Sequence, residues 1–213
     1  MTTEGVIKYR LDFREGPVPA PEQVAVLAAW QRICRGLELV GQQHGRYEGY
    51  AYGNLSCRTA PREFLVSGTQ TAGNTRPRAA DYTRVLDWSI AENRVVAEGP
   101  CRPSSESLTH AALYERDPAI GFVIHVHSPE IWRGATALGL PVTDPDVPYG
   151  TPAMAEEVWR LFETGTLGET GVFAMGGHED GVVAFGPDAV SAGLALIALL
   201  ARALEGRGSS QAG

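Results

Sequence analysis

The spacing of hydrophobic residues switches between a helical and a strand-like period along the chain. Apolar side chains recur at helical spacing over residues 21–44, which predicts a helix that Pro21 opens and Gly41 and Gly45 end. Similar spacing predicts further helices at residues 103–116, 129–138, 151–163 and 187–204. The residues before Pro21 carry mixed charge and two more prolines, so we expect an irregular arm over 1–20.

Short runs rich in β-branched and aromatic residues predict the strands. They cover residues 51–57, 63–66, 85–90, 94–97, 121–127, 171–175 and 181–185. Because helices and strands alternate and several strands are joined by short turns, we expect an α/β domain. The short turns favour a mixed or antiparallel sheet with helices on both of its faces. No linker interrupts the pattern, so residues 1–213 are predicted to form one domain that ends in a frayed polar tail, 206–213.

Composition and charge narrow the classes of function. The formal net charge of -7, without a basic stripe, argues against nucleic acid as a partner but not against a small anionic substrate. Three widely spaced cysteines match neither a disulfide framework nor a metal knuckle, which favours reduced thiols. The longest apolar run, 194–201, is shorter than a membrane span. We therefore expect a cytoplasmic protein without a membrane partner.

The segment 122–127, Phe-Val-Ile-His-Val-His, is the most informative for chemistry. Side chains two apart on a strand emerge on the same face, so His125 and His127 can converge on one ion. They stand at the end of the strand, where α/β folds often place their sites. The alternative is a pair of ordinary polar side chains on a strand.

A third donor is available in His178, which lies in a glycine-rich turn between two apolar strands. Taken alone, His178 is most simply a surface-turn residue. Together with the pair it completes three histidines and an open position, the ligand set of a catalytic zinc ion. Glu179 and Asp180 follow it, either to orient an imidazole or as solvated turn acids.

Several further residues are candidates for binding an anion. Pro103 opens a predicted helix whose first turn contains Ser104, Ser105 and Glu106, and free N–H groups there can bind an anion. Glu106 at such a position is also an ordinary complement to the helix dipole. Gly53-Asn54 and Ser67-Gly68 form two more turns, each of which is a weak signal by itself.

Five motifs along the chain resemble, in composition and in order, those of the class II aldolase/adducin family. They are Gly53-Asn54-Leu55-Ser56, Ser67-Gly68-Thr69, Pro103-Ser104-Ser105-Glu106, His125-Val126-His127-Ser128 and His178. The resemblance runs from about residue 24 to 204. It implies a three-layer α/β/α sandwich around a mostly antiparallel sheet, usually assembled as a homotetramer with active sites between subunits. It implies that one divalent ion, zinc first with manganese, cobalt or iron as alternatives, is bound by His125, His127 and His178. It also implies that Glu106 is the acid/base, and that the substrate phosphate is bound by Gly53, Asn54, Ser67, Gly68, Ser104 and Ser105.

The chain also departs from the family pattern. Family members usually have glycine directly after the distal histidine, where this chain inserts Glu179-Asp180. Aldolases and epimerases of the family use a tyrosine near the C-terminus, whereas no tyrosine follows Tyr149 here. Asp146 lies in a segment that resembles the one where the epimerases carry a catalytic aspartate, and its alternative is a turn acid beside prolines.

The resemblance makes an enzyme the leading hypothesis. We expect a metal-dependent lyase that cleaves a small hydroxy-carbonyl compound, such as a sugar phosphate, by retro-aldol chemistry through a metal-stabilised enediolate. The alternatives on the same site are epimerisation, dehydration and decarboxylation. A non-catalytic adducin-like interaction module and a redox-active iron site on the same fold are alternatives of other classes.

Overall fold

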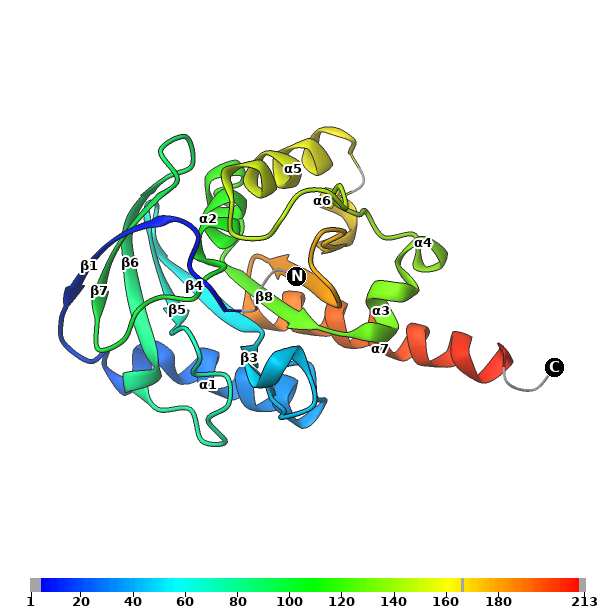
Figure 1. The fold of residues 1–213 in the computed structure, drawn as a ribbon, viewed down its shortest axis with the longest axis horizontal. Coiled ribbons are helices and arrows are strands. Elements are labelled where there is room, and N and C mark those ends of the chain that lie inside the picture. The colour runs from blue at the N-terminus through cyan, green and yellow to red at the C-terminus, as the bar shows by residue number, and fades with distance from the viewer. Residues whose placement is uncertain (1–4, 166, 211–213) are drawn as a thin grey trace.

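A single eight-stranded sheet organises the molecule. The computed structural model describes residues 5–165 and 167–210 (Figure 1). In spatial order the strands are β1-β7-β6-β5-β4-β8-β10-β9, and every neighbouring pair is antiparallel except β1 with β7. Their bounds are β1 (Arg10–Glu15), β4 (Asn54–Ala60), β5 (Glu63–Ser67), β6 (Tyr82–Ser89), β7 (Arg94–Gly99), β8 (Phe122–His127), β9 (Val172–Ala174) and β10 (Gly181–Gly186).

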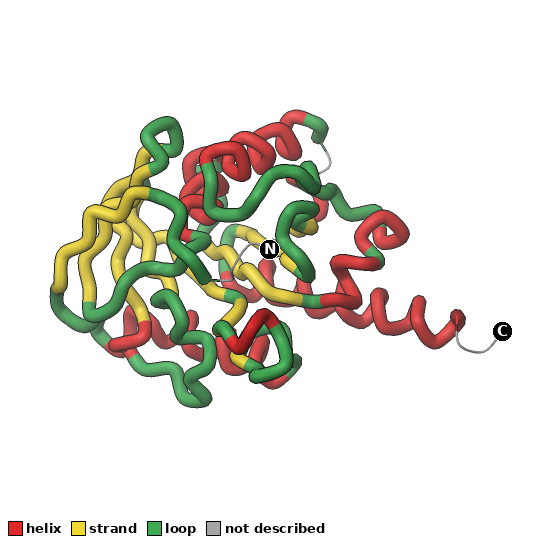
Figure 2. Tube along the Cα trace, in the orientation of Figure 1, coloured by secondary structure: helices red, strands yellow, loops and turns green. Residues whose placement is uncertain are grey.

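Helices cover both faces of this sheet (Figure 2). They are α1 (Pro21–Gly36), α2 (Ser107–Arg116), α3 (Pro129–Arg133), α4 (Ala135–Leu138), α5 (Pro152–Glu163), α6 (Leu167–Thr170) and α7 (Ala189–Ser210). Short strands β2 (Gly41–Gln42) and β3 (Ala51–Tyr52) pair beside the main sheet. Two single-turn 3-10 helices, η1 (Tyr47–Gly49) and η2 (Ala79–Asp81), lie in the loops.

The two hydrophobic cores lie on opposite faces of the sheet. One contains α2 and α5 with side chains such as Val123, and the other contains α1 and α7 with Ile124 and Val126. Because successive side chains on a strand point to opposite faces, His125 and His127 project on the side of α2 and α5. The predicted three-layer α/β/α sandwich with a mostly antiparallel sheet is confirmed.

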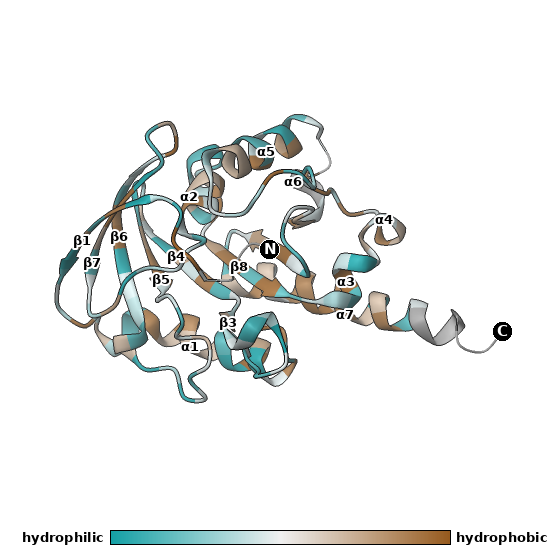
Figure 3. Cartoon of the chain, in the orientation of Figure 1, coloured by the Kyte–Doolittle hydropathy of each residue, from teal (hydrophilic) through white to brown (hydrophobic). Residues whose placement is uncertain are grey.

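Helix α7 is the longest helix among the described residues. Its stretch 189–206 is long and apolar enough to cross a membrane by length and composition, which the expectation drawn from the shorter run 194–201 overlooked. A buried core helix passes the same test, and here Ala192, Leu196 and Leu199 are buried against the sheet. Figure 3 shows hydrophobic colours on β8 and on the part of α7 behind it.

The structure corrects the predicted N-terminal arm. Residues 10–15 form β1, an edge strand paired in parallel with β7, while residues 5–9 and the proline-containing segment 16–20 are irregular. Leu11 and Phe13 alternate with charged residues and pack against the core, which is the period of a strand.

The first helix is shorter than predicted, and other predicted helices also differ from those in the structure. Helix α1 ends at Gly36, and Val40 is instead buried beside β2. Gly134 divides the predicted helix 129–138 into α3 and α4. Helix α7 continues to Ser210 through most of the predicted frayed tail, while residues 1–4 and 211–213 lie outside the described part of the chain.

Candidate metal centre

Three histidines converge at the end of β8. His125 and His127 come from β8, and His178 comes from the turn between β9 and β10. One nitrogen of each lies within 4.8 Å of the others, and the Nε2 atoms of His127 and His178 are 3.0 Å apart. All three side chains are buried, at most 4% exposed.

The turn that carries His178 requires its glycines. A Cβ atom on Gly176 would lie 2.2 Å from the carbonyl oxygen of Thr143, and one on Gly177 would lie 2.1 Å from that of Val147. Only glycine lets the backbones approach so closely. The loop at residues 143–147 therefore packs against this turn and fixes the position of His178.

Burial keeps the three imidazoles neutral. It lowers the pKa of His125 to about 4, and it lowers the pKa values of His127 and His178 well below the ordinary value of 6.5. Neighbouring histidines lower the last two further, with Arg46 acting on His127 and Lys8 on His178. Neutral imidazole is the form that binds a metal ion.

The donor set fits a divalent ion. Both ring nitrogens of His125 are buried and make no hydrogen bond of good geometry among the described residues. Leaving such atoms without a partner costs free energy, and a ligated ion would supply one. Three histidine nitrogens that form a group without a fourth residue in the described part of the chain match a catalytic rather than a structural site.

Glu106 lies at the edge of this cluster. It is the N-cap residue of α2, just before the helical turn in which it was expected, and is 1% exposed. Its Oε1 lies 3.9 Å from Nε2 of His178, and its Oε2 accepts a hydrogen bond from Oγ1 of Thr109 (2.9 Å). A buried carboxylate held this close to a metal-ligand set can transfer a proton to or from a bound substrate.

Gly53 and Asn54 adjoin the centre through the backbone of β8. Asn54 is buried and pairs with His125 in the register of β4 and β8. Gly53 has a φ of +76°, and a Cβ atom there would lie 2.7 Å from Val40 and 3.1 Å from the carbonyl oxygen of His125. The position therefore tolerates glycine best.

The remaining predicted anion-binding residues form a second group. The backbone N–H of Ser104 donates to the carbonyl oxygen of Ser67 (3.1 Å), and Gly68 forms a β-bridge with Pro103. The Glu106 N–H donates to the Ser104 hydroxyl (3.2 Å), and Ser105 is buried beside it. The loop that carries these serines is thus continuous with Glu106.

Asp146 lies at the surface. Its side chain is exposed, and its backbone N–H donates to Oδ1 of Asp144 (2.8 Å) within the same turn. Its proposed catalytic role stays a prediction.

Two tyrosines that the sequence analysis did not assign to the site pack on the histidines. The Tyr149 ring centroid lies 4.5 Å from that of His178, and the Tyr47 ring centroid lies 4.5 Å from that of His127. The Tyr47 hydroxyl donates to Oδ2 of the buried Asp180 (2.7 Å). Tyr149 could have been found from its place beside Asp146, whereas nothing in the sequence joins Tyr47 to the site.

Glu179 and Asp180, which follow His178, differ in their exposure to solvent. Asp180 has a φ of +62° and is 5% exposed, while Glu179 is exposed to solvent. Asp180 therefore lies where it can orient the site through Tyr47, and Glu179 has the environment of a solvated turn acid.

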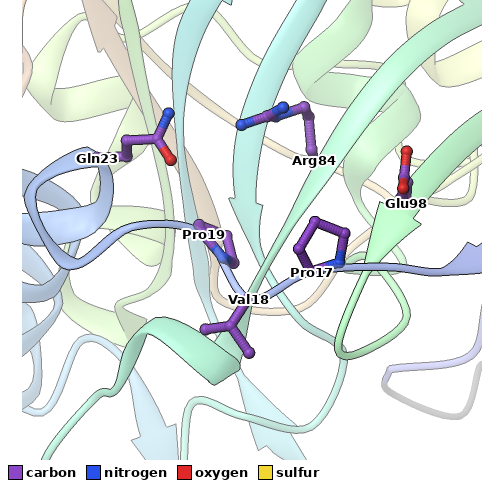
Figure 4. A pocket seen from close by; sticks show the side chains of 6 residues that line it. All are labelled: Pro17, Val18, Pro19, Gln23, Arg84 and Glu98. Atoms are coloured by element: carbon purple, nitrogen blue, oxygen red, sulfur yellow. The ribbon is translucent and has the colours of Figure 1, made fainter.

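A separate cavity of about 190 Å³ lies between the β1–α1 connection and the sheet (Figure 4). Its lining residues are Pro17, Val18, Pro19, Gln23, Arg84 and Glu98. None of them belongs to the histidine centre.

Comparison with known proteins agrees with this architecture. Residues 32–204 match the model of the class II aldolase and adducin N-terminal domain family. The chain is 30% identical over 163 residues to methylthioribulose-1-phosphate dehydratase of Gluconobacter oxydans, covering 75% of this chain and 71% of that protein. It is 38% identical over 162 residues to L-ribulose-5-phosphate 4-epimerase UlaF of Salmonella paratyphi B, covering 66% and 68%.

Solved structures share the fold at lower identity. An L-fuculose 1-phosphate aldolase superposes with a TM-score of 0.69 at 18% identity, covering 92% of this chain and 90% of the other. The L-fuculose-1-phosphate aldolase of Thermus thermophilus gives 0.66 at 20% identity, covering 91% and 98%. With the family match spanning most of the chain, these findings show that the protein belongs to the class II aldolase and adducin family.

Proposed function

We propose that this chain is a metal-dependent lyase that cleaves a small anionic hydroxy-carbonyl compound, such as a sugar phosphate, by retro-aldol chemistry. The observation that carries the proposal is the Glu106 carboxylate, 3.9 Å from His178 in a buried three-histidine cluster. A divalent ion bound there, zinc in the first instance, would supply Lewis acidity toward the oxygens of the substrate.

The protein's own residues would move the proton. Glu106 accepts a proton from the substrate hydroxyl as the carbon–carbon bond breaks, and then returns it to the carbon that has lost its bond. The hydrogen bond from Thr109 holds the carboxylate in place (2.9 Å). Ser104 and Ser105 in the loop that leads into Glu106, together with Ser67, to which Ser104 is hydrogen-bonded, would bind an anionic group.

Other reactions on the same site are the main alternatives. The dehydratase and the epimerase named above are relatives of this chain, and both names describe sugar-phosphate chemistry. Dehydration, epimerisation and decarboxylation also place charge on an oxygen next to the reacting carbon, so the same centre can support each of them. A non-catalytic interaction module would not need the three buried histidines. We further propose a cytoplasmic homotetramer, in line with the family resemblance.

Metal analysis and turnover test the proposal. Protein purified without added metal should contain about one divalent ion per chain, and His125→Ala should lose it. Metal-loaded wild type should cleave members of a sugar-phosphate panel, while Glu106→Gln should keep the metal and lose about 10²–10⁴-fold in kcat.

Glu156→Gln, on the exposed side of α5, is the matched control and should retain turnover. A Glu106→Gln enzyme with full turnover would exclude the acid/base role. If the wild type took up no metal, the non-catalytic interaction module would become the favoured hypothesis.

A further inference from the structure

A buried network of three polar side chains joins β4 to α2 and has no part in the proposed reaction. Oγ of Ser56 lies 2.6 Å from Nδ1 of His110 and 2.7 Å from the hydroxyl oxygen of Tyr114. All three residues are at most 2% exposed. Tyr114 belongs to the apolar core on the α2 side of the sheet, together with Leu108 and Val123. Polar groups buried so deeply need hydrogen-bond partners, because an unpaired one costs free energy.

The network ends at a nitrogen without such a partner. Because Nδ1 of His110 lies beside Ser56, Nε2 is the free end of the ring, and it makes no hydrogen bond of good geometry among the described residues. A network that only joined β4 to α2 would not need this second nitrogen. An apolar group of similar shape would fill the same space at a lower desolvation cost. The free Nε2 therefore indicates a further partner.

The register of β4 and β8 places His125 beside this network. Asn54 pairs with His125 and Ser56 pairs with Val123, so these four side chains share one face of the sheet. Ser56 and His125 are therefore diagonal neighbours, about 7–8 Å apart, a distance that an aromatic ring between them can span. His125 also contributes, after burial, to lowering the pKa of His110 to about 3, as expected for two imidazoles close together.

His125 needs a hydrogen-bond acceptor if it binds an ion. An ion occupies one ring nitrogen, and a ligating histidine normally donates the N–H of the other nitrogen to a neighbour, which fixes its tautomer and orientation. Neither ring nitrogen of His125 makes a hydrogen bond of good geometry within the described part of the chain. A consistent order of donors is available: His125 N–H to Nε2 of His110, Nδ1–H of His110 to Ser56, and the Ser56 hydroxyl to Tyr114.

We propose that His110 is a positioning residue of the metal centre, which accepts a hydrogen bond from the non-ligating nitrogen of His125 and holds that ring in its ligating orientation. The proposal rests on the metal binding in the proposed function and extends the centre to Ser56 and Tyr114. In this role His110 contacts neither the ion nor the substrate. The competing partner is the backbone of Val182, which acts on His125 to raise its pKa against the larger effect of burial.

Zinc affinity and the visible spectrum of the cobalt-substituted chain test this role. His110→Asn keeps an amide near the position of Nδ1 but has no group at that of Nε2, whereas His110→Gln places an amide near Nε2. In the full-length chain, we expect chelator competition to show a rise of about tenfold or more in the Kd for zinc in His110→Asn, and a smaller rise in His110→Gln. The cobalt absorption bands should shift in His110→Asn, because they report the arrangement of the ligands.

Ser56→Ala tests the network without changing the imidazole, and Thr83→Val is its matched control. Each variant removes one buried hydroxyl group. Thr83 lies in β6, which β5 and β4 separate from β8, and donates to the Glu98 carbonyl oxygen (3.0 Å). We expect Ser56→Ala to raise the Kd for zinc severalfold and Thr83→Val to leave it unchanged.

Thermal unfolding shows which variants are folded, and Ser56→Ala decides the question if His110→Asn is not. A purely structural network would lower Tm without a change in the Kd for zinc or in the cobalt spectrum. Kd values and spectra of His110→Asn and Ser56→Ala equal to those of Thr83→Val would overturn the proposal and leave Val182 as the partner of His125.

The outcome is separable from the lyase assay. A wild type that binds zinc through His110-supported ligands but cleaves no hydroxy-carbonyl compound would contradict only the reaction. A wild type that cleaves such a compound, with an unchanged Kd for zinc in His110→Asn, would contradict only the role of His110.

Discussion

Tyr47 connects a charged pair to one of the candidate metal ligands. Its hydroxyl accepts a hydrogen bond from Nη2 of Arg46 (2.8 Å) and donates one to Asp180 (2.7 Å), while its ring packs edge-on against His127. Groups that orient ligating histidines through such contacts affect metal affinity without touching the ion. Tyr47 also has a φ of 49°, an uncommon conformation for a tyrosine, which is consistent with a position fixed by its surroundings.

Removal of the Tyr47 hydroxyl should weaken metal binding. In Tyr47→Phe the ring remains on His127, but Asp180 loses its hydrogen-bond donor in a buried position. We expect about a tenfold rise in the Kd for zinc, measured by chelator competition. Tyr50→Phe, on a side chain that is 38% exposed, should leave the Kd unchanged. Equal affinities for the two variants would show that the Tyr47–Asp180 pair is only structural.

For single residues, the sequence predicted the histidine cluster better than the residues that pack around it. The convergence of His125 and His127 was predictable because the period of a strand places them on one face. Tyr47 and Asp180 are 133 positions apart in sequence, so their contact depends on tertiary packing that no local pattern encodes.

Between elements, the packing of α1 on α7 depends on a small residue. Gly193 lies in α7 directly against the Trp30 ring of α1, and a Cβ atom there would come within 1.9 Å of it. An isolated helix would be stabilised by alanine in place of glycine. Here the close contact should outweigh that preference.

The variant Gly193→Ala should therefore lower the free energy of unfolding by about 1–3 kcal/mol, as overpacked cores do. Gly206→Ala in the same helix is the control, because a Cβ atom there meets nothing within 4 Å. It should be neutral or slightly stabilising. Chemical denaturation of both variants measures the difference, and a Gly193→Ala chain as stable as wild type would mean that α1 shifts at no cost.

The elements that the sequence mispredicted share a physical cause. The apolar pattern continued past Gly36, yet Val40 fills the core from outside the helix. The prolines after residue 16 predict an irregular arm, although Leu11 and Phe13 alternate with charged residues in β1 and pack, partly buried, against the core. Long elements with a clear period, such as β8 and α5, were located within about a residue because local pattern and tertiary packing agree there.

The whole molecule should lose stability on mild acidification. Burial lowers the pKa of His110 to about 3 and that of His125 to about 4, from an ordinary value of 6.5. Below pH 6.5 these two histidines bind protons in the unfolded chain but not in the folded chain. The free energy of unfolding therefore falls as the pH drops toward 4 and 3. Above pH 6.5 these two groups contribute no pH dependence.

Urea unfolding of the metal-free chain between pH 7.5 and 4.5 measures this loss. It should reach a few kcal/mol, because each tenfold difference in proton affinity between the folded and unfolded chains is worth roughly 1.4 kcal/mol. His110→Gln should flatten the curve, whereas His44→Gln, on an exposed residue, should not. Zinc should delay the loss by occupying the nitrogen of His125. A curve for His110→Gln parallel to wild type would contradict the burial argument.

The parallel pairing of β1 with β7 has a consequence for the order of folding. Arg10 lies opposite Arg94, so this edge of the sheet closes a long stretch of chain, and contacts of such high sequence separation form slowly. Strands β4, β5 and β6 can pair with near neighbours in sequence before that closure. Lys8, two residues ahead of β1, would then reach Tyr149 only after the histidines are already in place, so that a refolding chain should assemble its histidine cluster before the N-terminal segment docks on Tyr149.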